Sequence, residues 1–360
     1  MTAPAWELGL RPEGVLHEVV ELNHKILKGI ENLSRIRAED ITVSPTPKQE
    51  VWRDGNVALV RFEPLVAKPH PVPVLIVYAL VNRPYMVDLQ EDRSLVRNLL
   101  LLGLDVYLID WGYPGAADRW LTLEDYIEGY VGDCVDVLRR RHGVEQVNLL
   151  GICQGGTFSL CYTSLHPDKV RNLITMVTPV DFHRKEGLLN VWAQYADVDL
   201  MVDALGNIPG EFMNFGFLML RPWALNMRKY IDLLDVLDNE KELMNFLRME
   251  KWIFDSPDQA GEAYREFMKD FYIGNKLIKG QVRIGGKPVR LETIAGPVLN
   301  LYGTQDHLVP PSSSMALEEY VGTKDYTVAS FPVGHIGMYV SGKVQRDLPP
   351  LIAEWLKQRS

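Results

Sequence analysis

The sequence has 360 residues, of which 47% are hydrophobic, and a formal net charge of −9. A chain of this length can bury the core of one large domain and leave material for an insertion. The acidic balance argues against nucleic acid as the main partner. A leader-like N-terminus and apolar runs of about 18 residues are both absent, so we expect no signal peptide and no membrane span. Three cysteines form no disulfide framework, which favours a reducing cytoplasm.

Residues 1–45 are expected to form an amphipathic helix followed by a linker. Surface helices usually bury their apolar stripe on their own domain, and we favour that arrangement here. A docking site for another subunit is the alternative. The two prolines within residues 44–48 indicate the linker. The apolar residues recur at about 3.5-residue spacing and are Leu16, Val19, Val20, Ile26, Leu27, Ile30 and Leu33.

Strands and helices alternate along residues 46–180, and the alternation resumes in residues 294–360. This spacing predicts an α/β fold with a doubly wound, mostly parallel sheet. The expected strands are 57–62, 74–78, 105–110, 147–150, 173–177 and 297–303, and the expected helices between them include 94–102 and 123–141.

The intervening residues 181–293 have a different pattern. They are helical in character and dense in methionine, phenylalanine and tryptophan, most of all in 213–220 and 249–254. Because this segment interrupts the α/β pattern before the strand at 297–303, we expect it to form a cap over the active site. Most of its aromatic side chains are expected to form the core of the cap itself. A Met-rich surface could also accommodate an oily product.

The segment Gly151-Ile152-Cys153-Gln154-Gly155-Gly156 has the form of a nucleophile elbow in which cysteine replaces the usual serine. An apolar strand precedes it and a helix follows it, which is the context that a G-x-[SC]-x-G motif requires. The two flanking glycines relieve crowding around a strained nucleophile, and the helix start favours a thiolate. Cys134 and Cys161 lie on apolar helical faces and are expected to be buried and inert.

An acid and a histidine follow the elbow in the order that an α/β-hydrolase fold uses. Asp306 comes directly after the strand 297–303, and His335 lies in a glycine-framed loop after a second short strand. The predicted triad is therefore Cys153, His335 and Asp306. A helix cap is the alternative role for Asp306. His307 is the rival base, although it is adjacent to Asp306, and neighbouring side chains on a loop seldom face each other.

The oxyanion hole is expected to consist of two backbone N–H groups. One belongs to Gln154, which follows the nucleophile, and the other to the loop after the strand 74–78, where we nominate Val81. Asn82 and His307 are further candidates for contacting the substrate. For Asn82, a structural role in a turn is equally compatible with the sequence.

Several segments together resemble the catalytic subunit of class III polyhydroxyalkanoate synthases, over nearly the whole chain. The segment around Cys153 is moderately specific for this family when it is taken alone. All of the matching segments together, in this order along the chain, are highly specific for it. Membership of class IV, whose enzymes are similar in size, is the alternative. The matching segments are Val77 to Met86, Ile109 to Pro114, Asn148 to Gly156, Glu250 to Gly261, Asp306 to Pro310 and Gly334 to Tyr339.

The resemblance implies polymerisation of (R)-3-hydroxyacyl groups, with 3-hydroxybutyryl as the expected unit, from coenzyme A thioesters into a polyester. It implies no cofactor, a companion synthase subunit, and a place at the surface of cytoplasmic polyester granules. Whether the chain also forms a dimer with itself is left open by the sequence. The alternatives are a cysteine-dependent thioesterase or dienelactone-type hydrolase, and a non-catalytic scaffold acting through the N-terminal helix. An apolar cap that excludes water favours transfer over hydrolysis.

Overall fold

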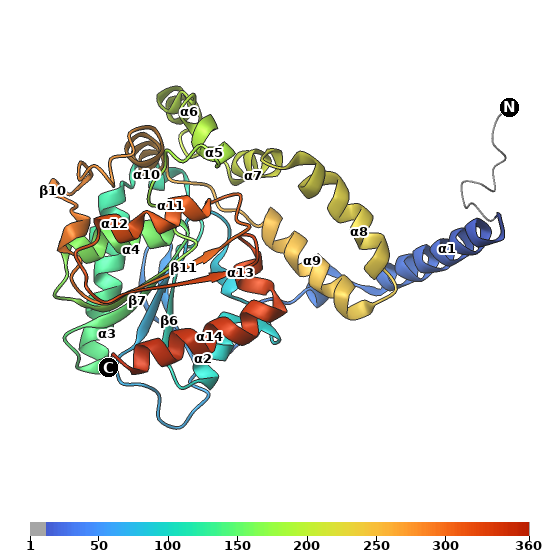
Figure 1. Cartoon of the computed structure of the whole chain (residues 1–360), viewed down its shortest axis with the longest axis horizontal. Coiled ribbons are helices and arrows are strands. Elements are labelled where there is room, and N and C mark those ends of the chain that lie inside the picture. Colours follow the sequence, from blue (N-terminus) through green and yellow to red (C-terminus); the bar gives the residue numbers. More distant parts are fainter. Residues whose placement is uncertain (1–11, 360) are drawn as a thin grey trace. The chain divides into compact units, whose positions relative to one another are not determined.

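The computed structural model describes residues 12–359, which belong to two compact units (Figure 1). The smaller one, here called the helical unit, comprises the residues up to Thr42 together with Phe215–Phe254. The larger one, here called the sheet unit, comprises Val43–Asn214 and the residues from Asp255 onward. The segment 181–293, expected as one insertion, therefore contributes to both units.

An eight-stranded sheet forms the centre of the sheet unit, in the order β1-β2-β6-β3-β7-β8-β11-β12. Neighbouring strands run parallel from β6 to β12, whereas β1 and β2 are added antiparallel at one edge. All residues of β3 and β7 are buried, as in a parallel sheet covered on both faces. The strands are β1 (Lys48–Asp54), β2 (Val57–Phe62), β3 (Val74–Val77), β6 (Val106–Asp110), β7 (Val147–Ile152), β8 (Val170–Met176), β11 (Val298–Gly303) and β12 (Tyr326–Phe331).

Helices cover both faces of this sheet, which confirms the doubly wound α/β prediction (Figure 1). On one face α2 (Leu95–Leu101) packs against α14 (Gly342–Lys357). On the other face α4 (Gln154–Leu165) packs against the π-helix η5 (Asp125–Val131), which continues into α3 (Gly132–His142). Shorter elements are η3 (Pro84–Val87), β4 (Asp88–Gln90), β5 (Arg93–Ser94), η4 (Ala116–Trp120), α11 (Pro311–Met315), α12 (Leu317–Tyr320) and α13 (Gly337–Val340).

The part of 181–293 that belongs to the sheet unit is helical only up to Ile273. A small apolar cluster that includes Val198, Val202, Tyr264 and Met268 holds its helices together. After Ile273 the chain forms a two-stranded ribbon and one 3₁₀ turn rather than the expected helix. The elements are α5 (Leu188–Ala193), α6 (Val198–Leu205), α7 (Gly210–Met219, which ends in the helical unit), α10 (Gly261–Phe267), η7 (Met268–Ile273), β9 (Arg283–Ile284), β10 (Lys287–Pro288) and η8 (Leu291–Thr293).

The helical unit consists of α1 (Pro12–Arg35), η2 (Ala38–Asp40), η6 (Trp223–Arg228), α8 (Lys229–Val236) and α9 (Glu240–Phe254). Helix α1 meets the turn after α8, where Gly29 is buried against Leu237 and Asn32 donates to the Leu237 carbonyl. Most of the apolar stripe is nevertheless exposed: Leu16 is 65% and Leu27 is 64% exposed. Packing within the unit therefore does not bury the stripe.

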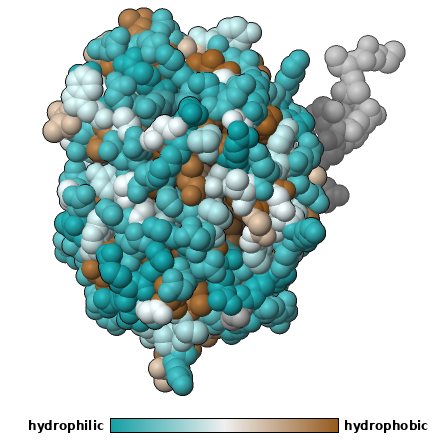
Figure 2. Space-filling model, turned by 90° about the vertical axis from the view of Figure 1, so that its left-hand side faces the viewer, coloured by the Kyte–Doolittle hydropathy of each residue, from teal (hydrophilic) through white to brown (hydrophobic). Residues whose placement is uncertain are grey.

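The surface of the sheet unit is mainly polar on the side of α6, α10 and β10. Figure 2 shows this side largely hydrophilic, with hydrophobic residues in small groups. Within residues 12–359, no helix has both the length and the apolar character needed to cross a membrane.

Candidate active site

Cys153 lies at a sharp turn between β7 and α4. Its backbone has a φ of 54° and a ψ of −126°, a conformation that residues other than glycine rarely adopt. Its side chain is only partly buried, so the thiol is accessible. The first N–H groups of α4 have no partner within the helix and direct positive charge toward the thiol. The local structure is therefore the predicted nucleophile elbow, occupied by sulfur.

Close backbone contacts explain the glycines of the elbow. A Cβ atom on Gly155 would lie 2.1 Å from the Val77 carbonyl oxygen and 2.5 Å from that of Tyr78. A Cβ atom on Gly151 would lie 2.5 Å from the Cα of Gly156. The elbow thus packs directly on the end of β3, and only glycine fits there.

Replacing Gly155 with alanine is expected to lower the free energy of unfolding by about 3 kcal/mol or more, because the new methyl group collides with rigid backbone. Urea denaturation measures this loss. Gly342→Ala is the control, since a Cβ at Gly342 meets nothing within 4 Å. A loss below about 1 kcal/mol for Gly155→Ala would show that the elbow yields to the methyl group.

His335 and Asp306 form a buried pair beside the thiol. The Nδ1 of His335 lies 2.7 Å from the Oδ2 of Asp306, and the charge of Cys153 acts on the same imidazole. The other carboxylate oxygen of Asp306 accepts from the N–H groups of Leu308 and Val309, at 2.9 Å each. The structure therefore brings together all three residues of the predicted triad.

The surroundings of His335 favour its charged form. Burial opposes the charge, but the Asp306 carboxylate and the Cys153 thiolate outweigh it and raise the pKa of His335 to about 10. A histidine normally titrates near 6.5. Because the folded pKa is raised, the imidazolium is present at neutral pH and is lost as the pH rises through about 10. The site thus holds a charged imidazole beside the Cys153 sulfur.

The other two cysteines lie in a different environment. Cys134 and Cys161 are fully buried on α3 and α4, and burial raises the pKa of both thiols well above the usual range. Thiolate is the reactive form of cysteine, so buried neutral thiols react slowly.

Iodoacetamide at neutral pH is therefore expected to alkylate Cys153 in the native protein and to leave Cys134 and Cys161 unmodified. Peptide mass spectrometry after a short exposure identifies the modified residue. Denatured protein, in which all three cysteines react, is the control. Preferential labelling of Cys134 would contradict the reactivity assigned to the elbow.

The backbone groups predicted for the oxyanion hole lie on two adjacent segments. Gln154 begins α4, so its N–H has no partner within the helix. Its side-chain Oε1 accepts from the N–H of Leu80 at 3.1 Å, which fixes the loop after β3 against the elbow. Val81 is half-buried on this loop, and Asn82 is buried with a φ of 59°, the left-handed conformation of a turn. Participation of these groups in catalysis stays a prediction.

His307 lies next to Asp306 on the loop after β11 and is half-buried. The carboxylate of Asp306 bonds to His335 and to the loop backbone. The short helix α11 begins after Pro310 without a side-chain cap. Asp306 therefore bonds to the imidazole of His335 and does not cap that helix.

Three tyrosines near the thiol were not predicted from the sequence. Tyr78 follows β3, Tyr272 lies in η7 and Tyr339 lies in α13. Burial raises the pKa of all three hydroxyls, and the charge of Cys153 raises each pKa further. The ring centroids of Tyr78 and Tyr339 lie 6.2 Å apart. In the sequence these residues stand in apolar or aromatic runs, which indicate core positions rather than a site.

Clusters of three or more histidine, cysteine or acidic side chains that could hold a metal ion do not occur within the described part of the chain.

Fold and site together define an α/β-hydrolase-fold protein whose nucleophile position carries cysteine. The family profile described as "alpha/beta hydrolase fold" matches residues 72–341. Among solved structures, a putative lipase from Sulfolobus solfataricus aligns with a TM-score of 0.55 and 15% identity, over 87% of this chain and 93% of that one. A likeness at this identity concerns the fold alone.

Sequence relatives define the family more narrowly. The profile "Poly-beta-hydroxybutyrate polymerase (PhaC) N-terminus" matches residues 22–99. The "Poly(3-hydroxyalkanoate) polymerase subunit PhaC" of Synechocystis is 62% identical, over 96% of this chain and 93% of that protein. The protein of the same name from Allochromatium vinosum is 55% identical, over 98% of this chain and 99% of that protein. The chain belongs to the poly(3-hydroxyalkanoate) polymerases, as their PhaC subunit, and is an acyltransferase.

Proposed function

We propose that this chain polymerises short-chain (R)-3-hydroxyacyl groups, with 3-hydroxybutyryl as the main unit, from coenzyme A thioesters through a covalent thioester on Cys153. The observation that carries this proposal is Cys153 at a nucleophile elbow, with the hydrogen-bonded pair of His335 and Asp306 beside it. The membership of the polymerase family supplies the reaction class.

The first step is an exchange of thioesters. The Cys153 sulfur attacks the acyl carbon, and the carbonyl oxygen becomes an oxyanion that the N–H groups of Gln154 and Val81 stabilise. As the intermediate collapses, the bond to coenzyme A breaks, and the His335 imidazolium gives its proton to the leaving thiolate. One thioester replaces another, so the step is nearly thermoneutral and the acyl group stays activated.

The second step forms the polyester bond. The 3-hydroxyl oxygen of one unit attacks the thioester carbon of another, and the now neutral His335 takes the hydroxyl proton. The bond to the Cys153 sulfur breaks and an oxygen ester forms, which is downhill from a thioester. A serine nucleophile would lose this driving force, since it would hold the acyl group as an oxygen ester. Asp306 orients His335 and stabilises its cationic form.

These steps use only side chains and backbone groups of the chain, together with the thioester and the growing polyester, so we propose that no cofactor takes part. We further propose that a companion synthase subunit assists the chain and that the complex works at the surface of polyester granules in the cytoplasm. Two observations support a companion: both relatives are named subunits, and helix α1 exposes an apolar stripe.

Purified chain should be incubated with (R)-3-hydroxybutyryl-coenzyme A, with and without a companion subunit from a relative, while free thiol and insoluble polyester are followed. Thiol release with polyester, accelerated by the companion, is the expected result. Thiol release with free hydroxy acid alone would identify a thioesterase. If the companion had no effect while polyester formed, the proposed partner would be rejected and the polymerase activity retained.

A further inference from the structure

Three of the matching segments meet in a cluster of polar side chains that the triad does not use. Its centre is Asp255, which is half-buried and belongs to the sheet unit. The hydroxyl of Tyr85 donates to one oxygen of this carboxylate at 3.1 Å, and the hydroxyl of Tyr113 donates to the other at 2.6 Å. Both tyrosines lie in segments that follow the parallel strands β3 and β6. The three matching segments are Val77 to Met86, Ile109 to Pro114 and Glu250 to Gly261.

The bond from Tyr85 fixes the loop that carries the proposed oxyanion group. This loop lies between β3 and η3 and includes Val81. Before Val81, the N–H of Leu80 donates to the Gln154 side chain of the elbow at 3.1 Å. After Val81, the chain enters η3, where the hydroxyl of Tyr85 is held by Asp255. The loop is therefore anchored on both sides of the N–H group that would bind the oxyanion.

Arg83 adds a further anchor, and this anchor depends on the same carboxylate. Its guanidinium donates to the Gly112 carbonyl at 2.7 Å and forms an ion pair with Asp110 at 2.8 Å. It also lies over the ring of Tyr113, 4.3 Å from the ring centroid. Because Asp255 binds the hydroxyl of Tyr113, it fixes the ring that Arg83 contacts. Asp255 thus supports the loop by two routes.

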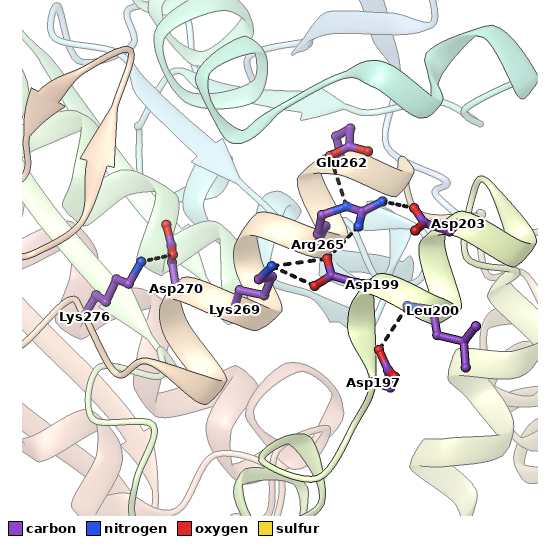
Figure 3. Close-up of polar contacts among 9 residues, drawn as sticks. All are labelled: Asp197, Asp199, Leu200, Asp203, Glu262, Arg265, Lys269, Asp270 and Lys276. Carbon is purple, nitrogen blue, oxygen red and sulfur yellow. Dashed lines mark hydrogen bonds and ion pairs between the residues drawn. The ribbon is translucent and has the colours of Figure 1, made fainter.

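The segment that follows Asp255 is itself firmly held. Gln259 pairs with Ile208 through two backbone hydrogen bonds, of 2.8 and 2.9 Å. The next element, α10, is joined to α6 by a network of ion pairs, in which Arg265 binds Asp199 at 2.6 Å (Figure 3). Exposed ion pairs stabilise little individually, but the network and the backbone pairing together restrict this segment. Asp255 therefore belongs to a fixed part of the sheet unit and can hold a neighbouring loop in place.

We propose that Asp255 is a positioning residue for the oxyanion hole. Through Tyr85 and Tyr113 it holds the loop of Val81 in place before the oxyanion forms. This inference rests on the proposed function. An oxyanion donor is effective because it is already in position when the charge develops, and a displacement of about 1 Å can lower the rate on the order of a hundredfold. Asp255 thus acts on the rate of acyl transfer without touching the substrate.

The test compares two reactions of Cys153 in the full chain. Acyl transfer from (R)-3-hydroxybutyryl-coenzyme A passes through an oxyanion, whereas alkylation by iodoacetamide is a direct displacement of iodide by the thiolate and forms none. Asp255→Ala removes both contacts, and Tyr85→Phe removes one hydroxyl. Tyr230→Phe is the matched control, because the Tyr230 hydroxyl also donates to a carboxylate, that of Glu250 at 2.9 Å, within the helical unit. Thermal melting checks that each variant is folded.

Acyl transfer is measured as coenzyme A release in the first turnover, over a range of substrate concentrations. Tyr85→Phe is expected to lower the maximal rate about tenfold and Asp255→Ala about a hundredfold, with the half-saturating concentration nearly unchanged. The alkylation rate of Cys153 should stay at the wild-type value in both variants. Tyr230→Phe should leave both reactions unchanged.

An unchanged maximal rate would overturn the inference. An equal fall in acyl transfer and alkylation would also overturn it, because the cluster would then support the elbow as a whole. So would a change confined to the half-saturating concentration, which would indicate contact with the substrate. If Asp255→Ala does not fold, Tyr85→Phe alone decides. Wild-type protein that releases no coenzyme A would instead refute the proposed function, on which the inference rests.

Discussion

Cys153→Ala is expected to abolish coenzyme A release, with a loss on the order of 10⁴-fold or more, as for removal of a covalent nucleophile. The reason is that no other described thiol is reactive: burial raises the pKa of both Cys134 and Cys161. Substrate should still bind, because alanine removes only the sulfur. The measurement is the initial rate of thiol release from (R)-3-hydroxybutyryl-coenzyme A.

Cys134→Ala is the matched control and should retain most of the activity, since Cys134 is a buried core residue on α3. Equal inactivation of the Cys134 variant would show that the nucleophile has been assigned wrongly. Cys153→Ser adds a second comparison. It keeps a nucleophile at the elbow but holds the acyl group as an oxygen ester, so chain extension should stay negligible even where some acylation occurs.

Asp306→Asn is expected to reduce the rate of polymer formation on the order of 10²- to 10⁴-fold. Asparagine keeps the shape of the side chain and can still bond to the loop backbone, but it removes the carboxylate that raises the pKa of His335. Burial then dominates and lowers that pKa. The imidazolium, present up to about pH 10 in the wild type, is lost at lower pH in the variant.

NMR titration of His335 tests this electrostatic account, with His335→Ala to assign the resonance. The midpoint should move to lower pH in Asp306→Asn. The raised wild-type pKa also contributes stability, which is complete below about pH 6.5 and is lost as the pH approaches 10. An unchanged midpoint together with a large loss of activity would mean that Asp306 acts on the substrate rather than through His335.

Most of the sheet could be predicted from the sequence, because buried parallel strands such as β3 and β7 are continuous apolar runs. Strand β1 was not predicted. It lies at the sheet edge with mainly exposed polar side chains, so it has no apolar pattern to reveal it. The ribbon of β9 and β10 was likewise not predicted, since its two-residue strands are too short for a periodic signal.

The arrangement of the triad followed from chain order, since the carboxyl ends of parallel strands meet at one edge of the sheet. β7 leads into Cys153, and β11 and β12 lead into the loops of Asp306 and His335. Tyr78 and Tyr272 could not be found in this way. An aromatic residue within an apolar run is usually a core residue, and only the folded chain shows which tyrosines lie close enough to Cys153 for its charge to act on them.

The most direct test of the central claim is mass spectrometry of protein quenched with acid soon after mixing with (R)-3-hydroxybutyryl-coenzyme A. The account predicts a hydroxyacyl group on the peptide that contains Cys153, held as a thioester that hydroxylamine removes. An acyl group found on another residue, or release of coenzyme A without any acylated peptide, would contradict covalent catalysis by Cys153.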